Sequence, residues 1–153
     1  LTTSSAASDV YKRQKLARRH RLPRPIADFI PEHQGTLKMG YFLHRARELN
    51  ADVDENLFRY HGPTPRSRET AILMMADGCE AALRSLPPNT SETEAIDTVR
   101  RIVESRLLDG QLRKSGLGRA EVELVLQAFV RVWRRMRHRR IPYPIPARPS
   151  PSS

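Results

Sequence analysis

The sequence has little of what disulfide-stabilised, zinc-binding or membrane-spanning proteins are built from. Its 153 residues include a single cysteine, Cys79, and aromatic residues make up only 6% of the chain. One cysteine excludes an internal disulfide framework and a zinc site built on cysteine pairs. No apolar run approaches the roughly 18 residues that a membrane-spanning helix needs. We therefore expect this stretch of chain to be soluble.

The motifs of several common catalytic classes are also missing. The chain has no glycine-rich phosphate loop, no His-Glu-x-x-His zinc motif and no Gly-x-Ser-x-Gly nucleophile elbow. Neither the alternating pattern of half-buried strands nor an internal repeat occurs. We predict an all-α domain of about 130 residues with a mainly aliphatic core.

Basic residues and helical periodicity are what the sequence does contain. Lysine and arginine number 27 against 17 aspartates and glutamates, which gives a formal net charge of +10. Apolar residues recur at three- and four-residue steps between prolines, glycines and capping residues. The predicted helical segments are 16–22, 26–34, 37–49, 67–86, 91–108 and 119–141.

The helix predicted at 67–86 carries the first candidate site residue, Asp77. Ser67 is a suitable N-cap, and two prolines at 87 and 88 end the helix. The predicted inward face comprises Ile72, Met75, Ala76, Cys79, Ala82, Leu83 and Leu86. Asp77 lies beside this face, and burying an unpaired carboxylate costs several kcal/mol. An arginine such as Arg84, exposure at the helix edge, or a metal ion would each relieve that cost.

The second candidate is His33, at the end of the short helix predicted at 26–34. Its apolar face is expected to comprise Ile26, Phe29 and Ile30. His33 follows near the same face, and Gly35 can end the helix. A histidine in this position is either a core or capping residue or a metal ligand.

The segment 50–66 is rich in Asp, Pro and Gly and is predicted to be a long loop. Loops of more than about 12 residues in a compact domain are often functional. The candidates for phosphate contacts in and just after it are Arg59, His61, Arg66 and Arg68. A solvated basic loop would explain the same residues equally well.

Both ends of the chain differ from the domain between them. Residues 4–14, SSAASDVYKRQ, back-translate into a sequence resembling a transposase-type sequencing adaptor, so we interpret 1–14 as non-native. We expect an upstream part of the native protein to be missing. Residues 145–153 are rich in Pro and Ser and are expected to form a disordered tail. The domain proper is therefore expected at 15–144.

The order of several motifs resembles one known family. The motifs are IPEHQGT at 30–36, GYFLHRA at 40–46, the long run at 58–86, RLLDGQL at 106–112 and AFVRVWRRMRHRRIPYP at 128–144. Together they resemble the C-terminal half of the HD domain of seven-transmembrane HD phosphohydrolases, the PgpH-type cyclic-di-AMP phosphodiesterases. The resemblance runs from about 15 to 144.

This resemblance implies a site with two divalent metal ions, Mn or Fe, in a helical bundle. His33 matches the histidine of the family's EHHGT motif, and Asp77 matches the late aspartate of its MLAD motif. Gln34 stands where the family usually has a second histidine, so it is expected to contact a ligand rather than to be one. The implied reaction is the hydrolysis of cyclic-di-AMP to pApA by a metal-activated water.

The resemblance also implies that part of the site is absent. The adjacent His-Asp pair and the remaining histidines of the family should lie upstream, so we expect this chain to be inactive alone. The implied parent is a bacterial inner-membrane protein with a cytoplasmic HD domain, and a homodimer is a further expectation. The surface left uncovered would favour aggregation.

Two other function classes stay open. The net charge and the arginine-rich segment 131–140 would suit a module that binds nucleic acid or an anionic surface, although the family resemblance leads us to expect no nucleic-acid partner. An HD-derived scaffold without catalysis is the second alternative. Steep salt dependence of DNA binding, unaffected by metal, would favour the first, and a full-length gene without the His-Asp pair would favour the second.

Overall fold

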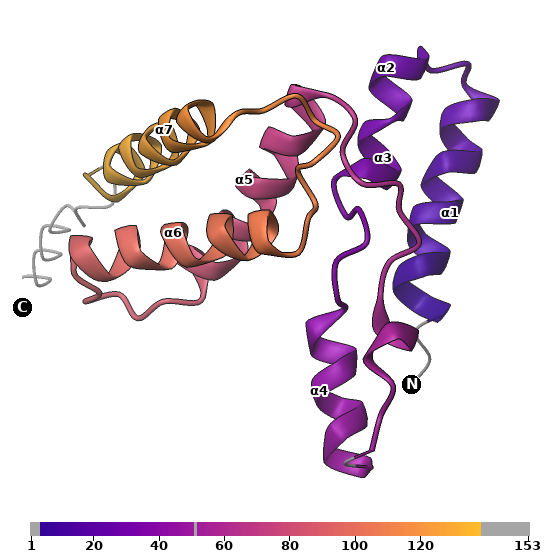
Figure 1. The fold of residues 1–153 in the computed structure, drawn as a ribbon, viewed down its shortest axis with the longest axis horizontal. Coiled ribbons are helices and arrows are strands. Elements are labelled where there is room, and N and C mark those ends of the chain that lie inside the picture. The colour runs from indigo at the N-terminus through magenta and orange to yellow at the C-terminus, as the bar shows by residue number, and fades with distance from the viewer. Residues whose placement is uncertain (1–3, 51, 139–153) are drawn as a thin grey trace, which may run out of the picture.

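The computed structural model describes residues 4–50 and 52–138, and every regular element in this part of the chain is a helix. The α-helices are α1 (Ser4–Arg19), α2 (Arg24–Ala27), α3 (Phe29–Glu32), α4 (Gly40–Leu49), α5 (Arg68–Arg84), α6 (Glu92–Leu108) and α7 (Arg119–His138). A 3-10 helix, η1 (Glu55–Phe58), follows α4. Figure 1 shows α5, α6 and α7 as one group and α1 to α4 as the other. The all-α prediction is confirmed.

Local capping signals set the starts of the two central helices. The Ser67 side chain accepts a hydrogen bond from the Thr70 amide, and Ser91 accepts one from the Glu94 amide. In each case the side chain of the later residue bonds back to the capping residue and completes a capping box. α5 and α6 therefore begin where the sequence predicted.

Elsewhere the predicted boundaries shift. The helix predicted from 37 begins at Gly40, because residues 37–39 run beside 58–60 in extended form. The Met39 amide donates to the Phe58 carbonyl at 2.6 Å, and the Tyr60 amide donates to the Leu37 carbonyl at 3.0 Å. The helix predicted at 26–34 is divided into α2 and α3, and the predicted loop contains η1.

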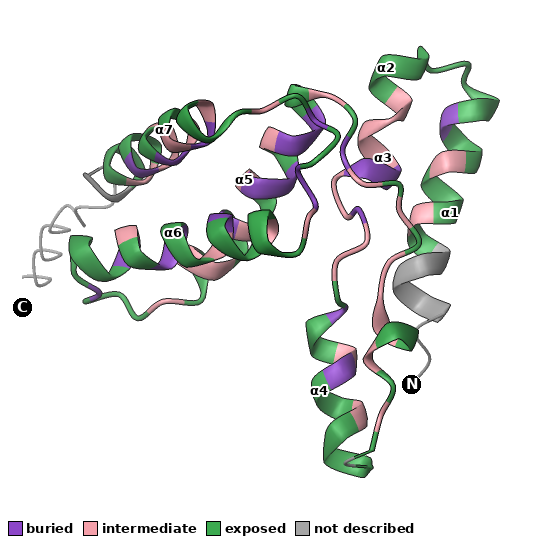
Figure 2. Cartoon of the chain, in the orientation of Figure 1, coloured by how far each residue is buried: buried purple, intermediate pink, exposed green. Residues whose placement is uncertain are grey.

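The core lies between α5, α6 and α7, and α5 and α6 have the most extensive contact. Its buried residues are Ala71, Met74, Met75, Cys79, Val99, Val103, Leu112, Val122, Leu126 and Val130. Figure 2 shows buried positions along these helices, whereas α4 is mostly exposed. The core is aliphatic and sulfur-containing, as the composition predicted.

Ile26, which was predicted to lie on an apolar face, is exposed, and so are Leu49, Leu107, Val132 and Met136. Leu49 is 89% exposed because it is the last residue of α4. On α7 the buried face is centred on Val122, Leu126 and Val130, so Val132 and Met136 lie outside it. Helical periodicity indicated a buried face but not its centre.

The structure tests few of the predictions made for the two ends of the chain. α1 begins at Ser4 and runs through the segment interpreted as non-native, whose origin stays a prediction. The predicted tail at 145–153 and the predicted end of the last helix at 141 lie outside the described residues. In the part of the chain that is described, no helix combines the length and the apolar character needed to cross a membrane.

Candidate functional site

A cavity of about 460 Å³ separates the two groups of helices and contains both candidate metal ligands. Its volume is within the usual range of small-molecule sites. One side of the cavity is lined by residues of the segment that leads from α3 into α4, together with Tyr60: His33, Gln34, Leu37, Lys38, Met39, Gly40, Tyr41, Phe42 and Tyr60. The residues from α5 and α6 are Met74, Asp77, Gly78, Ser105, Arg106 and Asp109. His33, Gln34 and Asp77 are thus brought to one place.

His33 is held in the orientation typical of a metal-binding imidazole. It caps the C-terminus of α3, and its Nδ1 lies 2.8 Å from the Phe29 carbonyl oxygen. With Nδ1 donating to that carbonyl, Nε2 carries a lone pair. The Gln34 side-chain amide donates to Nε2 at 3.1 Å. Gln34 therefore occupies the position on His33 that a cation would take.

Asp77 is exposed at the edge of α5, which is one of the alternatives that the sequence left open for this carboxylate. The buried residues of α5 are Thr70, Ala71, Met74, Met75 and Cys79. Asp77 follows Met74 by three residues and lies at the edge of this face, where it borders the cavity. Arg84 does not pair with it, because Arg84 is 3.3 Å from Glu80. Asp77 has no ion pair or side-chain hydrogen bond with another described residue, so its oxygens are available to a cation.

His33 and Asp77 form part of a ligand set rather than a complete one. Across residues 4–50 and 52–138, no three His, Cys, Asp or Glu side chains form a group that could hold a metal ion. None of the five histidines in the sequence is followed directly by aspartate. An imidazole nitrogen and a carboxylate oxygen nevertheless suit Mn²⁺ or Fe²⁺. The residues present fit a divalent cation that has further ligands.

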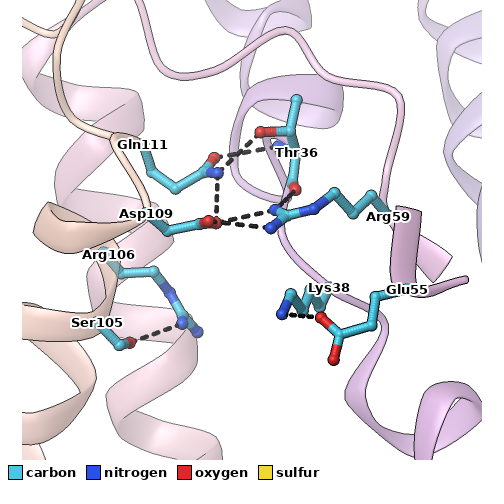
Figure 3. A network of polar contacts seen from close by, with 8 residues as sticks. All are labelled: Thr36, Lys38, Glu55, Arg59, Ser105, Arg106, Asp109 and Gln111. Carbon is cyan, nitrogen blue, oxygen red and sulfur yellow. Dashed lines mark hydrogen bonds and ion pairs between the residues drawn. The ribbon is translucent and has the colours of Figure 1, made fainter.

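Arg59, a predicted substrate contact, belongs to a polar network at the rim of the cavity (Figure 3). Its guanidinium donates to both Asp109 oxygens at 3.1 Å and to the Thr36 carbonyl at 2.8 Å. The hydrogen bond from Arg59 holds the pKa of Asp109 below its ordinary value. The buried Gln111 amide accepts from the Thr36 amide and donates to the Thr36 hydroxyl and to Asp109. Arg59 thus joins the two groups of helices.

Arg66 supports α3 rather than lining the cavity. Glu32, which is 1% exposed, accepts hydrogen bonds from the Arg66 amide and Nε, both at 2.8 Å, and from the Thr70 hydroxyl at 2.7 Å. Burial alone would raise the pKa of Glu32, but these hydrogen bonds outweigh it and lower the pKa. Because Glu32 precedes His33, this network fixes the histidine against α5.

The remaining predicted phosphate contacts also lie outside the cavity lining. Arg68 is 3.2 Å from Glu121, and His61 is exposed. The substrate role of Arg59, Arg66 and Arg68 stays a prediction, although each is engaged by a carboxylate.

Sequence reasoning missed several residues that shape the site. Glu32 and Gln111 lie in the motifs PEHQGT and RLLDGQL, which were noted without assigning them a function. Tyr60 and Arg106 also lie in quoted motifs, the run 58–86 and RLLDGQL, but the sequence assigned them no role, because their place beside Asp77 depends on contacts between distant segments. Burial and the charge of Asp77 raise the pKa of Tyr60.

At the basic end of α7, the structure leaves the nucleic-acid-binding alternative untested. Arg134 pairs with Glu92 at the start of α6, and residues beyond 138 lie outside the described part of the chain.

Known proteins resemble this chain in both sequence and fold. No protein-family model matches it. An uncharacterized protein of Synechocystis is 48% identical over 134 residues, and the cyclic-di-AMP phosphodiesterase PgpH of Listeria monocytogenes is 35% identical over 132. These alignments cover 84% and 85% of the chain but only 16% and 18% of the relatives' length.

A solved structure extends the resemblance to the fold. The crystal structure of the L. monocytogenes PgpH HD domain in complex with cyclic-di-AMP matches with a TM-score of 0.84 and 29% identity. The match covers 94% of this chain and 68% of that one. The architecture is that of part of an HD domain. The chain is similar to part of the PgpH-type HD phosphohydrolases, as the order of its motifs predicted, and an HD phosphodiesterase family implies divalent metal ions.

Proposed function

We propose that this chain forms one wall of a metal-dependent phosphodiesterase site for a cyclic dinucleotide, with His33 and Asp77 as metal ligands. The observation that carries the proposal is that an oriented imidazole and an unpaired carboxylate border the same cavity. The similar Listeria domain is known in complex with cyclic-di-AMP. We infer the same substrate for the site to which this chain contributes, with pApA as the product.

The residues of this chain would each have a distinct task. His33, fixed through Nδ1 by the Phe29 carbonyl, would present Nε2 to a metal ion once the Gln34 amide turns away. Asp77 would supply a carboxylate oxygen from the opposite side. Two bound Mn or Fe ions would lower the pKa of a water and offset the charge of the phosphodiester oxygens. Gln34 would then be free to bond a water or the substrate.

We further propose that the chain does not turn over substrate by itself. A two-metal site needs more ligands than His33 and Asp77, and the sequence lacks the adjacent His-Asp pair that gives the HD family its name. In the proposed parent the domain is cytoplasmic, anchored to the bacterial inner membrane by other segments, and able to form a homodimer.

The experiment that tests this function places the chain in a complete HD domain. Residues 15–138 would replace the matching segment of the Listeria PgpH HD domain, and hydrolysis of cyclic-di-AMP would be measured with Mn²⁺. We expect the chimera to produce pApA and the chain alone to produce none.

Matched substitutions in the chimera test the ligands. His33→Ala and Asp77→Ala are expected to lower the rate by about a hundredfold or more. His44→Ala and Asp97→Ala, which alter exposed residues outside this cavity, are expected to leave it unchanged. Full activity in both ligand variants would refute the assignment.

A further inference from the structure

We infer that Arg106 is a phosphate-binding residue of this cavity and that Gly78 provides the space for its guanidinium. The inference rests on the proposed function, which places a phosphodiester in the cavity. It assigns the anion to the first residue of the motif RLLDGQL, for which the sequence alone indicated no role.

Arg106 lies near the C-terminus of α6 and lines the cavity together with His33 and Asp77. Figure 3 shows its side chain next to Asp109 and bonded, among the residues drawn, to Ser105. That bond runs from Nη1 to the Ser105 hydroxyl at 3.1 Å. The rest of the guanidinium is left with donors that point to no acceptor in the described chain.

Arg106 forms no ion pair with a carboxylate of the described residues, and the charges of Asp109 and Asp77 act on it only from a greater distance. Its buried Nε has no hydrogen-bond partner, and no carboxylate of the described residues lies within 4.0 Å of the guanidinium. Burial accordingly lowers its pKa. By contrast, Lys38 in the same cavity pairs with Glu55, and Arg59 pairs with Asp109. A partly buried guanidinium without an anion is unfavourable, and a bound phosphate would satisfy it.

Gly78 explains how the guanidinium reaches this position. Glycine inside a helix is less stable than alanine, so a glycine here needs a reason. A Cβ at position 78 would lie 2.9 Å from Nη2 of Arg106 and 3.1 Å from Cγ2 of Ile102. The missing side chain therefore makes room for Arg106 directly beside Asp77.

Asp77 and Arg106 lie next to each other in the cavity lining, and this arrangement suits a metal-bound phosphate. A carboxylate alone would repel a phosphodiester, whereas the planar guanidinium presents N–H donors that match phosphate oxygens. With a cation on Asp77, the phosphate would lie between two positive centres. Arg106 would bind a non-bridging oxygen and take no part in proton transfer.

The test measures ligand binding to the full chain by titration calorimetry with Mn²⁺ and cyclic-di-AMP. Arg106→Met is expected to weaken nucleotide binding by about ten- to a hundredfold. Gly78→Ala is expected to weaken it similarly, because the end of Arg106 must move and Ile102 must shift slightly to admit the Cβ, while the higher helix propensity of alanine offsets the cost in melting temperature. Arg84→Met, which alters an exposed arginine of α5, is the matched control and should bind like the wild type.

Two further measurements separate this inference from the proposed function. Mn²⁺ affinity, measured by electron paramagnetic resonance, should survive in Arg106→Met, because Arg106 is no metal ligand. If the wild-type chain binds no cyclic-di-AMP, titration with inorganic phosphate decides the role of Arg106, while the chimera decides the proposed function.

Phosphate binding that Arg106→Met abolishes would support the inference. Unchanged binding in Arg106→Met, or no phosphate binding by the wild type, would overturn it. Should Arg106→Met fail to fold, Gly78→Ala decides the matter alone.

Discussion

At the scale of single residues, Glu32 determines where His33 lies. Its carboxylate is buried and joins α3 to Arg66 and to Thr70, the residue that completes the capping box of α5. A carboxylate in an interior is stable only when its hydrogen bonds are satisfied. The adjacent histidine is therefore positioned by a network and not by the short helix α3 alone.

Replacing Glu32 by glutamine should destabilise the fold and remove part of its acid sensitivity. We expect the free energy of unfolding at neutral pH to fall by about 1–3 kcal/mol, because the charge-assisted hydrogen bonds are weakened. The folded-state pKa of Glu32 is lowered from 4.5, so its contribution is present above that pH and is lost as the pH falls through the lower value. Urea denaturation across this range measures both effects. An equally stable Glu32→Gln protein at neutral pH would contradict the role, and Glu104→Gln, on the exposed side of α6, is the control.

Cys79 should be chemically inert in the folded chain. It is 2% exposed, and burial raises the pKa of its thiol to about 11. The thiolate is the reactive form, so labelling by a disulfide reagent at mildly alkaline pH should be slow until denaturant opens the core. Fast labelling without denaturant, compared with a free cysteine, would show that the α5–α6 core is not formed.

The site residues differ in how far the sequence could predict them. His33 and Asp77 lie in motifs, and the cavity does bring them together. Their environment could not be predicted, since the exposure of Asp77 depends on where the buried face of α5 is centred. Arg106 lies in a motif as well, but its role could not be predicted, because that role depends on the contact between α6 and a glycine in α5.

At the scale of helices, α5 joins the core to the site. Met74, Met75 and Cys79 pack against α6 and α7, while Asp77 and Gly78 border the cavity. Stability of this helix and geometry of the site are therefore linked.

Removing the cap of α5 tests that link. Ser67→Ala should cost about 1 kcal/mol of unfolding free energy, because the Thr70 amide loses its acceptor. It should also loosen Glu32, whose partner Thr70 is in the same turn. Thermal unfolding measures the first effect, and Ser91→Ala at the start of α6 provides a cap of the same kind away from Glu32. A larger effect at Ser91 than at Ser67 would contradict the link.

Helix boundaries were predictable only where local chemistry determines them. Ser67 and Ser91 carry their own capping partners within four residues. The start of α4 depends instead on pairing between 37–39 and 58–60, across η1. No pattern inside 37–49 contains that information.

At the scale of the whole molecule, a small polar network joins the two groups of helices. Asp109 and Gln111, after α6, bond to Arg59 and Thr36 on the opposite side of the cavity. The cavity keeps its shape only while these segments stay together.

Asp109→Asn should loosen this connection. We expect the free energy of unfolding to fall by about 1 kcal/mol, because Arg59 loses an ionised partner that is only partly exposed. Hydrogen exchange should quicken at the Thr36 amide, which bonds to Gln111. Asp97→Asn, on an exposed part of α6, should change neither quantity, and unchanged exchange in Asp109→Asn would contradict the role of the network.

The most direct test of the site is a Mn²⁺ titration of the full chain followed by nuclear magnetic resonance, which detects weak binding through paramagnetic broadening. If His33 and Asp77 hold one cation, the amide signals of Gln34 and Gly78 should broaden first and together, and Asp77→Ala should abolish both effects. Broadening spread over exposed carboxylates such as Glu48, with Gln34 and Gly78 unaffected, would contradict the metal assignment.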